Sequence, residues 1–335
     1  MKNTISDIAK MAGVSKATVS RVLNNSKPVS SEVRNKVMHV IEETGFKPSA
    51  LARGLATKET KLIGVVIPDV ANPIFSELVK GMEEEANNSG YNVLLCNTYL
   101  DQSKEMQYLQ VLKDKEVDGI IFLTTHETEE QVKFFKSFSK PVVTDRKFKQ
   151  MDLPSVGVND FEASYEAVNY LINLSHSRIA MVRGPIQDQS HGSNRYLGYI
   201  KAMEDNDLEI DETRILEGDF TVKAGYEAMG KLLAVKKSPS AVFFANDLMA
   251  VGGIRCIVDS GLQVPEDISV IGFDDIPIAS MFIPSLTTVK QPTFEVGIKM
   301  MEKVVHLIRG KEDEKHSVFE TKLMLRNSTC KHDGS

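Results

Sequence analysis

From residue 62 onward, short continuous apolar runs alternate with segments in which apolar residues recur at helical spacing. A continuous apolar run bounded by polar residues is typical of a strand buried on both faces. The predicted strands are LIGVVIP (62–68), YNVLLCN (91–97), DGIIFL (118–123), PVVTD (141–145), RIAMVRG (178–184), AVFFAN (241–246) and ISVIGFDD (268–275). The predicted helices are 76–89, 103–115, 128–138, 161–174, 193–205, 222–235 and 247–260. This α/β alternation predicts parallel sheets flanked by helices, in two similar lobes because the cycle restarts after 145.

Residues 4–44 have a different pattern, with apolar residues at helical spacing in three short segments. The predicted helices span roughly 5–12, 16–24 and 31–44. Thr4, Ser15 and Ser30 are N-cap candidates, while Gly13 and Gly45 suit left-handed C-caps. The first part of the chain is therefore predicted to be all-α. The next segment, SALARGLATK, is too short to form a stable helix alone.

Composition adds a charge asymmetry. The 335-residue chain is 42% hydrophobic, enough for more than one core, and its net charge is −6. Residues 1–60 hold 10 Lys and Arg against 5 Asp and Glu, a net charge of +5, whereas the remaining 275 residues hold 30 against 41, a net charge of −11. A basic module on an acidic body favours a polyanion as the partner of the N-terminal part.

Several function classes lack their sequence signals. No apolar run reaches the roughly 18 residues of a membrane span, and the N-terminus has no apolar signal region. Cys96, Cys256 and Cys330 are odd in number and far apart, so we expect a cytoplasmic protein without disulfides. The histidines show no metal-ligand spacing, and the nucleotide-binding and hydrolase motifs are missing. We therefore expect no metal, no cofactor and no enzyme activity.

The first two predicted helices, joined by a glycine-containing turn, form a helix-turn-helix candidate. In such motifs the second helix lies in the major groove and its N-terminal residues meet base edges. Arginine and lysine suit guanine, and alanine contacts a thymine methyl group. The candidate DNA-binding residues are Thr4, Ser15, Lys16, Ala17, Ser20, Arg21 and Asn24. Spacing alone leaves open a small helical bundle with a solvated polar face.

Polar and aromatic residues follow the predicted strands. In a two-lobed α/β protein, ligands bind at the carboxyl ends of the parallel strands, between the lobes. The residues found there are Asn72, Pro73, Ile74, Phe75, Asp145, Arg146, Gln189, His191, Arg195, Phe220, Asn246, Asp247, Asp274, Asp275 and Gln291. This chemistry suits a sugar, because each hydroxyl both donates and accepts and aromatic rings cover the sugar's C–H surface. For Asp247 and Asp275 we favour helix capping. Asp145 and Asp274 also form a conceivable glycosidase pair, but two acceptors for one bound sugar is the simpler interpretation.

The segment TISDIAKMAGVSKATVSRVLNN (4–25) resembles the N-terminal signature of the LacI/GalR family of bacterial repressors. KPSALARGLATKETKLIGVVIPD resembles that family's hinge and first core strand, and the similarity continues through GFDDIP and SLTTVKQP. The resemblance implies base contacts by Lys16, Ala17 and Arg21. It also implies that Leu55 in the hinge wedges into the minor groove, where a leucine unstacks a base step and kinks the duplex. Two hinges side by side imply a homodimer that reads a pseudo-palindromic DNA site.

The resemblance also implies a periplasmic-binding-protein-like core and a ligand set. Matched to ribose-type members, that set falls on Asn72, Ile74, Phe75, Asp145, Arg146, Arg195, Phe220, Asn246, Asp274 and Gln291. Ile74 departs from those members, which carry an aromatic residue there. Gln189 and His191 match ligand-contacting positions of the purine-binding member, so a purine is the alternative effector.

A further alternative is the catabolite-control branch, which binds a phosphorylated carrier protein. Phe294 and Glu295 resemble its docking surface, but Glu302 stands where that branch pairs an arginine with phosphoserine, and an acid there repels phosphate.

We therefore expect a helix-turn-helix domain (1–48), a hinge (49–60) and an effector-binding, dimerising core (61–335). Its N-lobe is predicted to comprise 61–160 and 291–320, and its C-lobe 161–290 and 321–335. The predicted function is transcription regulation, as a repressor controlled allosterically by a small sugar such as ribose. A sugar-binding transport protein or a sugar-acting enzyme is the alternative of a different class.

Overall fold

The computed structural model describes residues 3–24, 28–46, 59–124, 127–186 and 191–333. The chain divides into two compact units, one ending at Lys61 and the other beginning at Leu62. The predicted hinge lies almost wholly outside the described residues. Each unit has its own hydrophobic core and is described by itself.

The first unit is a bundle of α1 (Ile5–Met11), α2 (Lys16–Asn24) and α3 (Ser31–Thr44), as predicted. Thr4 caps α1 in a reciprocal capping box with Asp7, and Gly45 ends α3 in the left-handed conformation. A small core, Ile8, Ala9, Val19, Val22 and Val37, holds the bundle together. The sequence prediction of three capped helices is confirmed.

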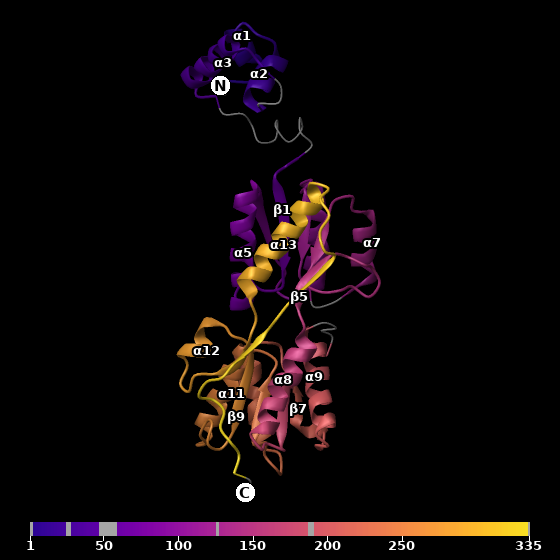
Figure 1. Ribbon diagram of the computed structural model, residues 1–335, viewed down its shortest axis with the longest axis vertical. Helices are drawn as coiled ribbons and strands as arrows, with labels where there is room; N and C mark the ends of the chain where they lie inside the picture. Colours follow the sequence, from indigo (N-terminus) through magenta and orange to yellow (C-terminus); the bar gives the residue numbers. More distant parts are fainter. Residues whose placement is uncertain (1–2, 25–27, 47–58, 125–126, 187–190, 334–335) are drawn as a thin grey trace. The chain divides into compact units, whose positions relative to one another are not determined.

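The second unit contains two six-stranded sheets (Figure 1). In the first sheet, all strand pairs are parallel. Its strands, in spatial order, are β11 (His316–Phe319), β5 (Ser155–Val158), β4 (Val142–Thr144), β3 (Gly119–Phe122), β1 (Leu62–Ile67) and β2 (Asn92–Asn97). Helices α5 (Pro73–Ser89) and α13 (Thr293–Ile308) enclose one core with this sheet, and α6 (Gln102–Asp114) and α7 (Glu129–Ser137) enclose another.

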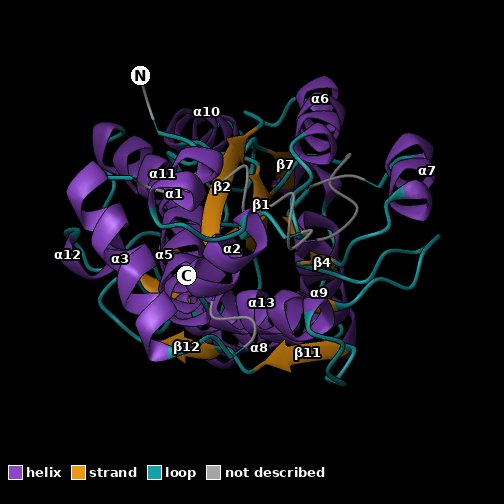
Figure 2. Cartoon of the chain, turned by 90° about the horizontal axis from the view of Figure 1, so that it is seen from above, coloured by secondary structure: helices purple, strands orange, loops and turns teal. Residues whose placement is uncertain are grey.

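The second sheet repeats the arrangement. Its strands, in spatial order, are β12 (Lys322–Met324), β10 (Thr287–Lys290), β9 (Ser269–Asp274), β8 (Ala241–Phe244), β6 (Ile179–Arg183) and β7 (Ile215–Glu217). Only β12 is antiparallel. The helices of this lobe are α8 (Asp160–Asn173), α9 (His191–Asp205), α10 (Val222–Leu233), α11 (Asp247–Asp259) and the short α12 (Pro277–Met281), with a 3₁₀ turn at Glu212–Arg214. In Figure 2 the edge strands β11 and β12 lie at one side of the second unit. The predicted fold class is confirmed.

The chain passes between the two sheets three times, after β5, after β10 and between β11 and β12. Each lobe is therefore assembled from segments far apart in sequence. The hydrophobic pattern did not predict β5, β7, β10, β11 or β12, because polar residues interrupt or bound their short apolar stretches, whereas the equally short β3 and β8 lie in the longer apolar runs GIIFL and AVFFA. Helix α13 was not predicted either, although its 16 residues carry an apolar face at helical spacing.

Two glycines set the spacing of α5 and α13 in the first lobe. A Cβ atom added to Gly297 of α13 would lie 2.2 Å from the backbone oxygen of Leu78, and one added to Gly81 of α5 would lie 2.1 Å from that of Phe294. Neither obstacle is a side chain that can rotate away. The two helices therefore lie against each other at a distance that only glycine permits.

We expect Gly297→Ala to lower the free energy of unfolding of the core by about 1–3 kcal/mol, because α13 must move away from α5. Gly230→Ala in the exposed face of α10 is the matched control, since its Cβ meets only Cys256 Sγ at 3.7 Å. The control is expected to be neutral or stabilising by about 0.5–1 kcal/mol. Urea unfolding of both variants, followed by circular dichroism, tests this. Equal stability of the two variants would contradict it.

Candidate functional site

A cavity of about 270 Å³ lies at the carboxyl ends of the strands, lined by residues of both lobes. Each sheet has a switch point between two neighbouring strands, from which the chain continues in opposite directions across the sheet. The two strands are β1 and β3 in the first sheet and β6 and β8 in the second. Ligands bind at such switch points because the loops on either side diverge there. The cavity is therefore where this topology places a ligand.

Most of the predicted ligand residues meet in this cavity. Those that line it are Asn72, Ile74, Phe75, Asp145, His191, Arg195, Phe220, Asn246, Asp274 and Gln291. Gln189 lies outside the described residues. Arg146 does not line the cavity. Its guanidinium lies 5.7 Å from the centre of the Phe148 ring, and both terminal nitrogens are buried without a hydrogen-bond partner among the described residues.

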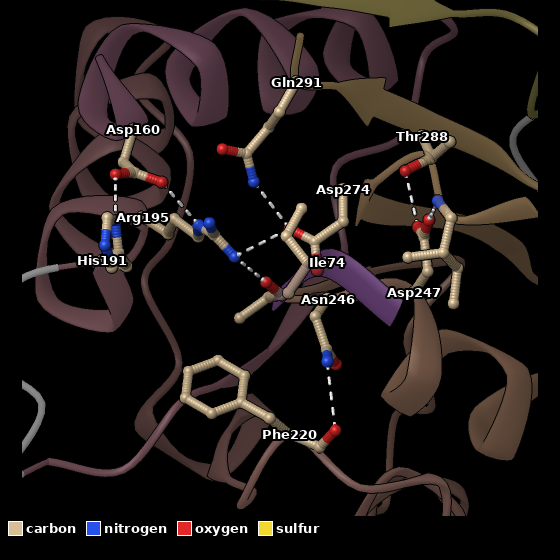
Figure 3. A network of polar contacts seen from close by, with 12 residues as sticks. Ile74, Asp160, His191, Arg195, Phe220, Asn246, Asp247, Asp274, Thr288 and Gln291 are labelled. Atoms are coloured by element: carbon tan, nitrogen blue, oxygen red, sulfur yellow. Dashed lines mark hydrogen bonds and ion pairs between the residues drawn. The ribbon is translucent and has the colours of Figure 1, made fainter. Parts of the chain in front are cut away.

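Arg195 is the centre of a buried polar network (Figure 3). Its Nε donates to Asp160 Oδ1 at 2.7 Å, and its Nη1 donates to the Ala245 carbonyl at 2.6 Å. Nη1 also lies 3.6 Å from Asp274 Oδ1, and the guanidinium stacks on the Phe273 ring at 3.7 Å. The guanidinium can remain charged in this buried position because ion pairs and hydrogen bonds compensate for its loss of hydration. The network therefore fixes Arg195 at the cavity wall.

His191 joins the two lobes. Its Nδ1 bonds Asp160 Oδ2 at 2.7 Å, and its Nε2 bonds Asp145 Oδ2 at 3.2 Å. Asp160 and His191 belong to helices of the second lobe, whereas Asp145 follows β4 of the first. Burial disfavours the charged imidazolium, but the two carboxylates outweigh it and raise the pKa of His191 to about 10. Both ring nitrogens are thus used within the protein.

The carboxyl groups of the network differ in acidity. Burial raises the pKa of Asp160, but Arg195 and His191 outweigh this effect and lower it to about 2. For Asp274, burial prevails over Arg195 and Gln291 and raises the pKa to about 6. Burial and the neighbouring Asp274 also raise the pKa of Asp247 well above its ordinary value. Asp274 therefore changes its charge just below neutral pH, whereas Asp160 stays ionised there.

The capping interpretation of Asp247 and Asp275 is wrong. Asn246 caps α11, accepting from the Met249 amide at 3.0 Å, and Asp247 is the first helical residue. The fully buried Asp247 accepts from Thr288 Oγ1 at 2.5 Å and from the Ile276 amide at 2.9 Å, so it ties three segments together. Asp275 pairs with Arg326 at 2.6 Å. Both acids are structural links beside the cavity, because strand-end positions in a buried sheet reach other chain segments.

Two cavity residues adopt backbone conformations with positive φ that are rare for residues other than glycine. Phe220 has φ 66° and Asp274 has φ 114°. Such conformations cost about 1–3 kcal/mol each and persist where the surroundings enforce them. Gly184 leaves the space for the Phe220 ring, since a Cβ there would lie 2.3 Å from Phe220 Cζ. Asn246 Nδ2 donates to the Phe220 carbonyl at 3.0 Å and supports this backbone. Gln291 Nε2, between the lobes, donates to Asp274 Oδ1 at 2.7 Å.

Sequence reasoning missed Asp160, a group of apolar residues, and four polar residues that line the cavity, namely Asp69, Asp219, Thr221 and Thr293. Asp160 was not a candidate, although it follows a strand and opens a helix as the chosen residues do. It was overlooked because β5, the strand before it, was not predicted. The apolar group belongs to the core of the first lobe and comprises Leu78, Leu123, Val156, Val296 and Met300. Nothing distinguishes these five from ordinary core residues in the sequence.

The candidate DNA-binding residues lie in the first unit. Ser15, Lys16, Ala17 and Arg21 are exposed, while Val19 and Val22 of the same helix are buried. Ser15 Oγ accepts from the Thr18 amide at 3.1 Å, which caps α2. Thr4 is exposed at the start of α1, and Ser20 is half-buried. Asn24 is the last residue of α2, and its side chain is not among those that the structure describes. Leu55 lies outside the described residues. Helix α2 thus presents a cationic, small-residue face at its N-terminal end.

Within the described ranges, no cluster of three or more histidine, cysteine or acidic side chains has the arrangement to hold a metal ion. None of the described helices has the length and apolarity to cross a membrane.

Comparison with known proteins accounts for both units. Residues 4–49 match the model of bacterial regulatory proteins of the lacI family, and residues 168–329 match a periplasmic binding protein-like domain. The transcriptional regulator RegA of Clostridium saccharobutylicum and catabolite control protein A of Priestia megaterium are each 38% identical, over 98% of this chain and 100% of their own length. The repressor PurR of Pectobacterium carotovorum is also 38% identical, over 94% of this chain and 93% of its own.

Solved structures agree with these relatives. A lac repressor dimer bound to operator and the anti-inducer ONPF superposes with a TM-score of 0.89 at 28% identity, covering 98% of this chain and 100% of that one. A LacI-family regulator from Enterococcus faecium with bound ribose has a TM-score of 0.73 at 28% identity, covering 81% of this chain and 100% of that one. The exposed face of α2, the two-lobed core with its polar cavity and these full-length relatives together show that the chain belongs to the LacI family and is a DNA-binding transcription regulator.

Proposed function

We propose that this regulator is a repressor, that a small sugar bound in the cavity controls its affinity for operator DNA, and that it acts as a homodimer on a pseudo-palindromic site. The observation that carries the proposal is the Arg195 network, which holds a cation, carboxylates and an amide at one cavity wall. Paired donors and acceptors of this kind suit vicinal hydroxyl groups. The ribose-bound relative supports the same ligand class.

The same contacts disfavour a purine. The purine alternative rests on Gln189, which lies outside the described residues, and on His191. Both ring nitrogens of His191 bond carboxylates of the protein, at 2.7 and 3.2 Å. A purine that used this ring would have to break one of the two ionic contacts. A sugar needs no contact with His191, because Asp274, Asn246 and Gln291 line the cavity beside it.

A phosphorylated carrier protein is a second candidate partner, favoured by the 38% identity to catabolite control protein A. The surface it would use carries Glu302, whose carboxylate lies 3.6 Å from Lys299. Lys299 is also paired with Asp313 at 3.3 Å. Because the cation is already neutralised and an acid stands beside it, this surface suits a phosphate poorly. We therefore place sugar control first.

The cross-lobe contact of His191 provides a route for control. Asp145 moves with the first lobe and Asp160 with the second, so the imidazolium between them resists a change in lobe angle. A ligand that forms hydrogen bonds with Asp145 or Asp274 changes the strength of these ionic contacts between the lobes. The coupling between ligand and DNA must be reciprocal. If the ligand changes the affinity for operator DNA by some factor, operator DNA changes the affinity for the ligand by the same factor.

The DNA-binding face is tested by substitution. We expect Lys16→Ala and Arg21→Ala each to weaken binding to a duplex selected by the wild-type protein by about tenfold or more, because each removes a contact to base edges. Lys36→Ala is the matched control, since Lys36 is exposed on α3 and pairs with Glu32. Fluorescence anisotropy at one fixed salt concentration measures all three. If the control weakens binding as much as the other two, the assignment of α2 fails.

The titration of Asp274 predicts how ligand binding depends on pH. A hydroxyl donates best to an ionised carboxylate, so with a pKa of about 6 the affinity for a sugar should fall about tenfold from pH 7 to pH 5. A thermal-shift screen of pentoses, hexoses and purines first identifies a ligand, and calorimetry at the two pH values then gives the ratio. Asp274→Asn should abolish the change, whereas Asp219→Asn at the same cavity should retain it. A purine that stabilises the protein while sugars do not would refute sugar control.

The His191 bridge makes a separate contribution to stability. Since the folded-state pKa of about 10 exceeds the ordinary value of 6.5, the contribution is complete below pH 6.5 and is lost as pH rises towards 10. The difference in unfolding free energy between wild type and His191→Gln should therefore shrink across that range. Chemical unfolding at pH 6, 8 and 10 measures it. A difference that stays constant with pH would exclude a charged bridge.

A further inference from the structure

Between β9 and β10 the chain leaves the second sheet over residues 275–286, a segment that contains the short helix α12. This excursion begins directly after Asp274, the cavity residue whose carboxylate accepts from Gln291 (Figure 3). Both Asp274 and Asp275 have positive φ, 114° and 57°. Two consecutive residues with side chains adopt such conformations only where other contacts hold them there. The orientation of Asp274 therefore depends on whatever fixes this turn.

Arg326 bonds both ends of the excursion from outside it. It lies in the C-terminal tail (325–333), which follows β12. Its Nη2 donates to Asp275 Oδ1 at 2.6 Å, and its Nη1 donates to the Leu286 carbonyl at 2.8 Å. Asp275 is the first residue of the excursion and Leu286 is the last. The planar guanidinium thus closes the excursion at its base, with two donors in a fixed geometry that a lysine cannot reproduce.

This clamp is largely buried. The side chains of Arg326 and Asp275 are 16% and 11% exposed, and Leu286 is fully buried. A charge-assisted hydrogen bond in such a position is little screened by solvent and restricts geometry strongly. The next residue, Ile276, is held separately, because its amide donates to Asp247 Oδ2 at 2.9 Å. Two contacts from distant parts of the chain therefore fix the backbone that follows Asp274.

Attachment of the tail does not require the guanidinium. The backbone amide of Arg326 donates to Thr287 Oγ1 at 3.0 Å. The fully buried Ser328 Oγ accepts from the Thr287 amide at 2.8 Å and donates to the Val270 carbonyl at 2.7 Å. These contacts already join the tail to β9 and β10. The side chain of Arg326 thus acts on the turn at Asp275 in addition to anchoring the tail.

We propose that Arg326, which does not line the cavity, is a positioning residue for effector binding and holds the Asp274 carboxylate towards the cavity by fixing Asp275. The inference rests on the proposed binding of an effector in this cavity, but not on which sugar is bound. It extends the effector site to the C-terminal tail, a part of the chain that contributes no residue to the cavity lining.

The titration of Asp274 tests this without any ligand. Burial raises the pKa of Asp274 from 3.8 to about 6, so its ionisation disfavours the folded state as pH rises from 3.8 towards and beyond 6. The folding equilibrium constant of Asp274→Asn relative to wild type should therefore increase about tenfold between pH 5 and pH 8. In an Arg326→Lys background, which retains the positive charge, the increase should fall below about threefold, because a loosened turn exposes the carboxyl group. Urea unfolding of the four proteins at both pH values measures this.

Ser328→Ala is the matched control, since it removes two hydrogen bonds of the tail and leaves the guanidinium in place. In that background the increase of about tenfold should persist. The inference is overturned if Arg326→Lys keeps the full increase, or if Ser328→Ala reduces it equally. If Arg326→Lys does not fold, Asp275→Asn takes its place, because it removes the charge of the clamp and tolerates positive φ. It should reduce the increase as well, and an unchanged increase would overturn the inference.

Calorimetry with D-ribose on the full-length protein separates this inference from the sugar proposal. Where wild type binds D-ribose, Arg326→Lys should bind it about tenfold more weakly, because the Asp274 acceptor is no longer held in place. Ser328→Ala should bind D-ribose about as tightly as wild type. Equal affinity of wild type and Arg326→Lys would overturn the positioning role. Absence of D-ribose binding to wild type would count against ribose as effector, while the titration of Asp274 still decides the role of Arg326.

Discussion

The site depends on one constraint: charges buried between the lobes need partners that each lobe alone does not supply. Asp160, Arg195 and Asp274 are each at most 6% exposed. Within the second lobe these three charges neutralise one another in part. His191 then connects them to the first lobe through its ion pair with Asp145. An unpaired charge at this depth would be strongly destabilising. The relative position of the two lobes is therefore linked to how these four charges and the imidazolium are satisfied.

This constraint operates between two bodies that are themselves closely packed. The spacing of α5 and α13, set by Gly81 and Gly297, leaves no room for the first lobe to deform gradually. In the second lobe, a Cβ on Gly252 of α11 would lie 1.9 Å from the Val222 carbonyl of α10. Packed cores of this kind respond to a ligand by moving as units. The three connections between the lobes, rather than the lobes themselves, are then where a change in angle is absorbed.

The sequence predicted much of this architecture, and the failures have physical causes. Long helices and continuous apolar strands were found because their periodicity extends over many residues. Strands such as β5 and β7 were missed because polar residues bound their short apolar stretches, so that no continuous apolar run marks them. The loss of β5 concealed Asp160. Ten ligand candidates meet in the cavity because the carboxyl ends of parallel strands share one edge. Arg146 does not line the cavity, because its guanidinium lies over the Phe148 ring instead. The residues of the hinge and Leu55 stay predictions.

Some residues that line the cavity could not be predicted from strand-end positions. Strand-end positions report the polar contacts of a ligand, because side chains there leave the sheet and enter the cleft. Leu78, Val296 and Met300 sit on helices α5 and α13, where the same apolar spacing serves the core. Whether a core residue also faces a cavity depends on how far the neighbouring elements close over it. The cavity residues contributed by α5 and α13 are therefore a product of tertiary packing, set by the helix pair that also forms the core of the first lobe.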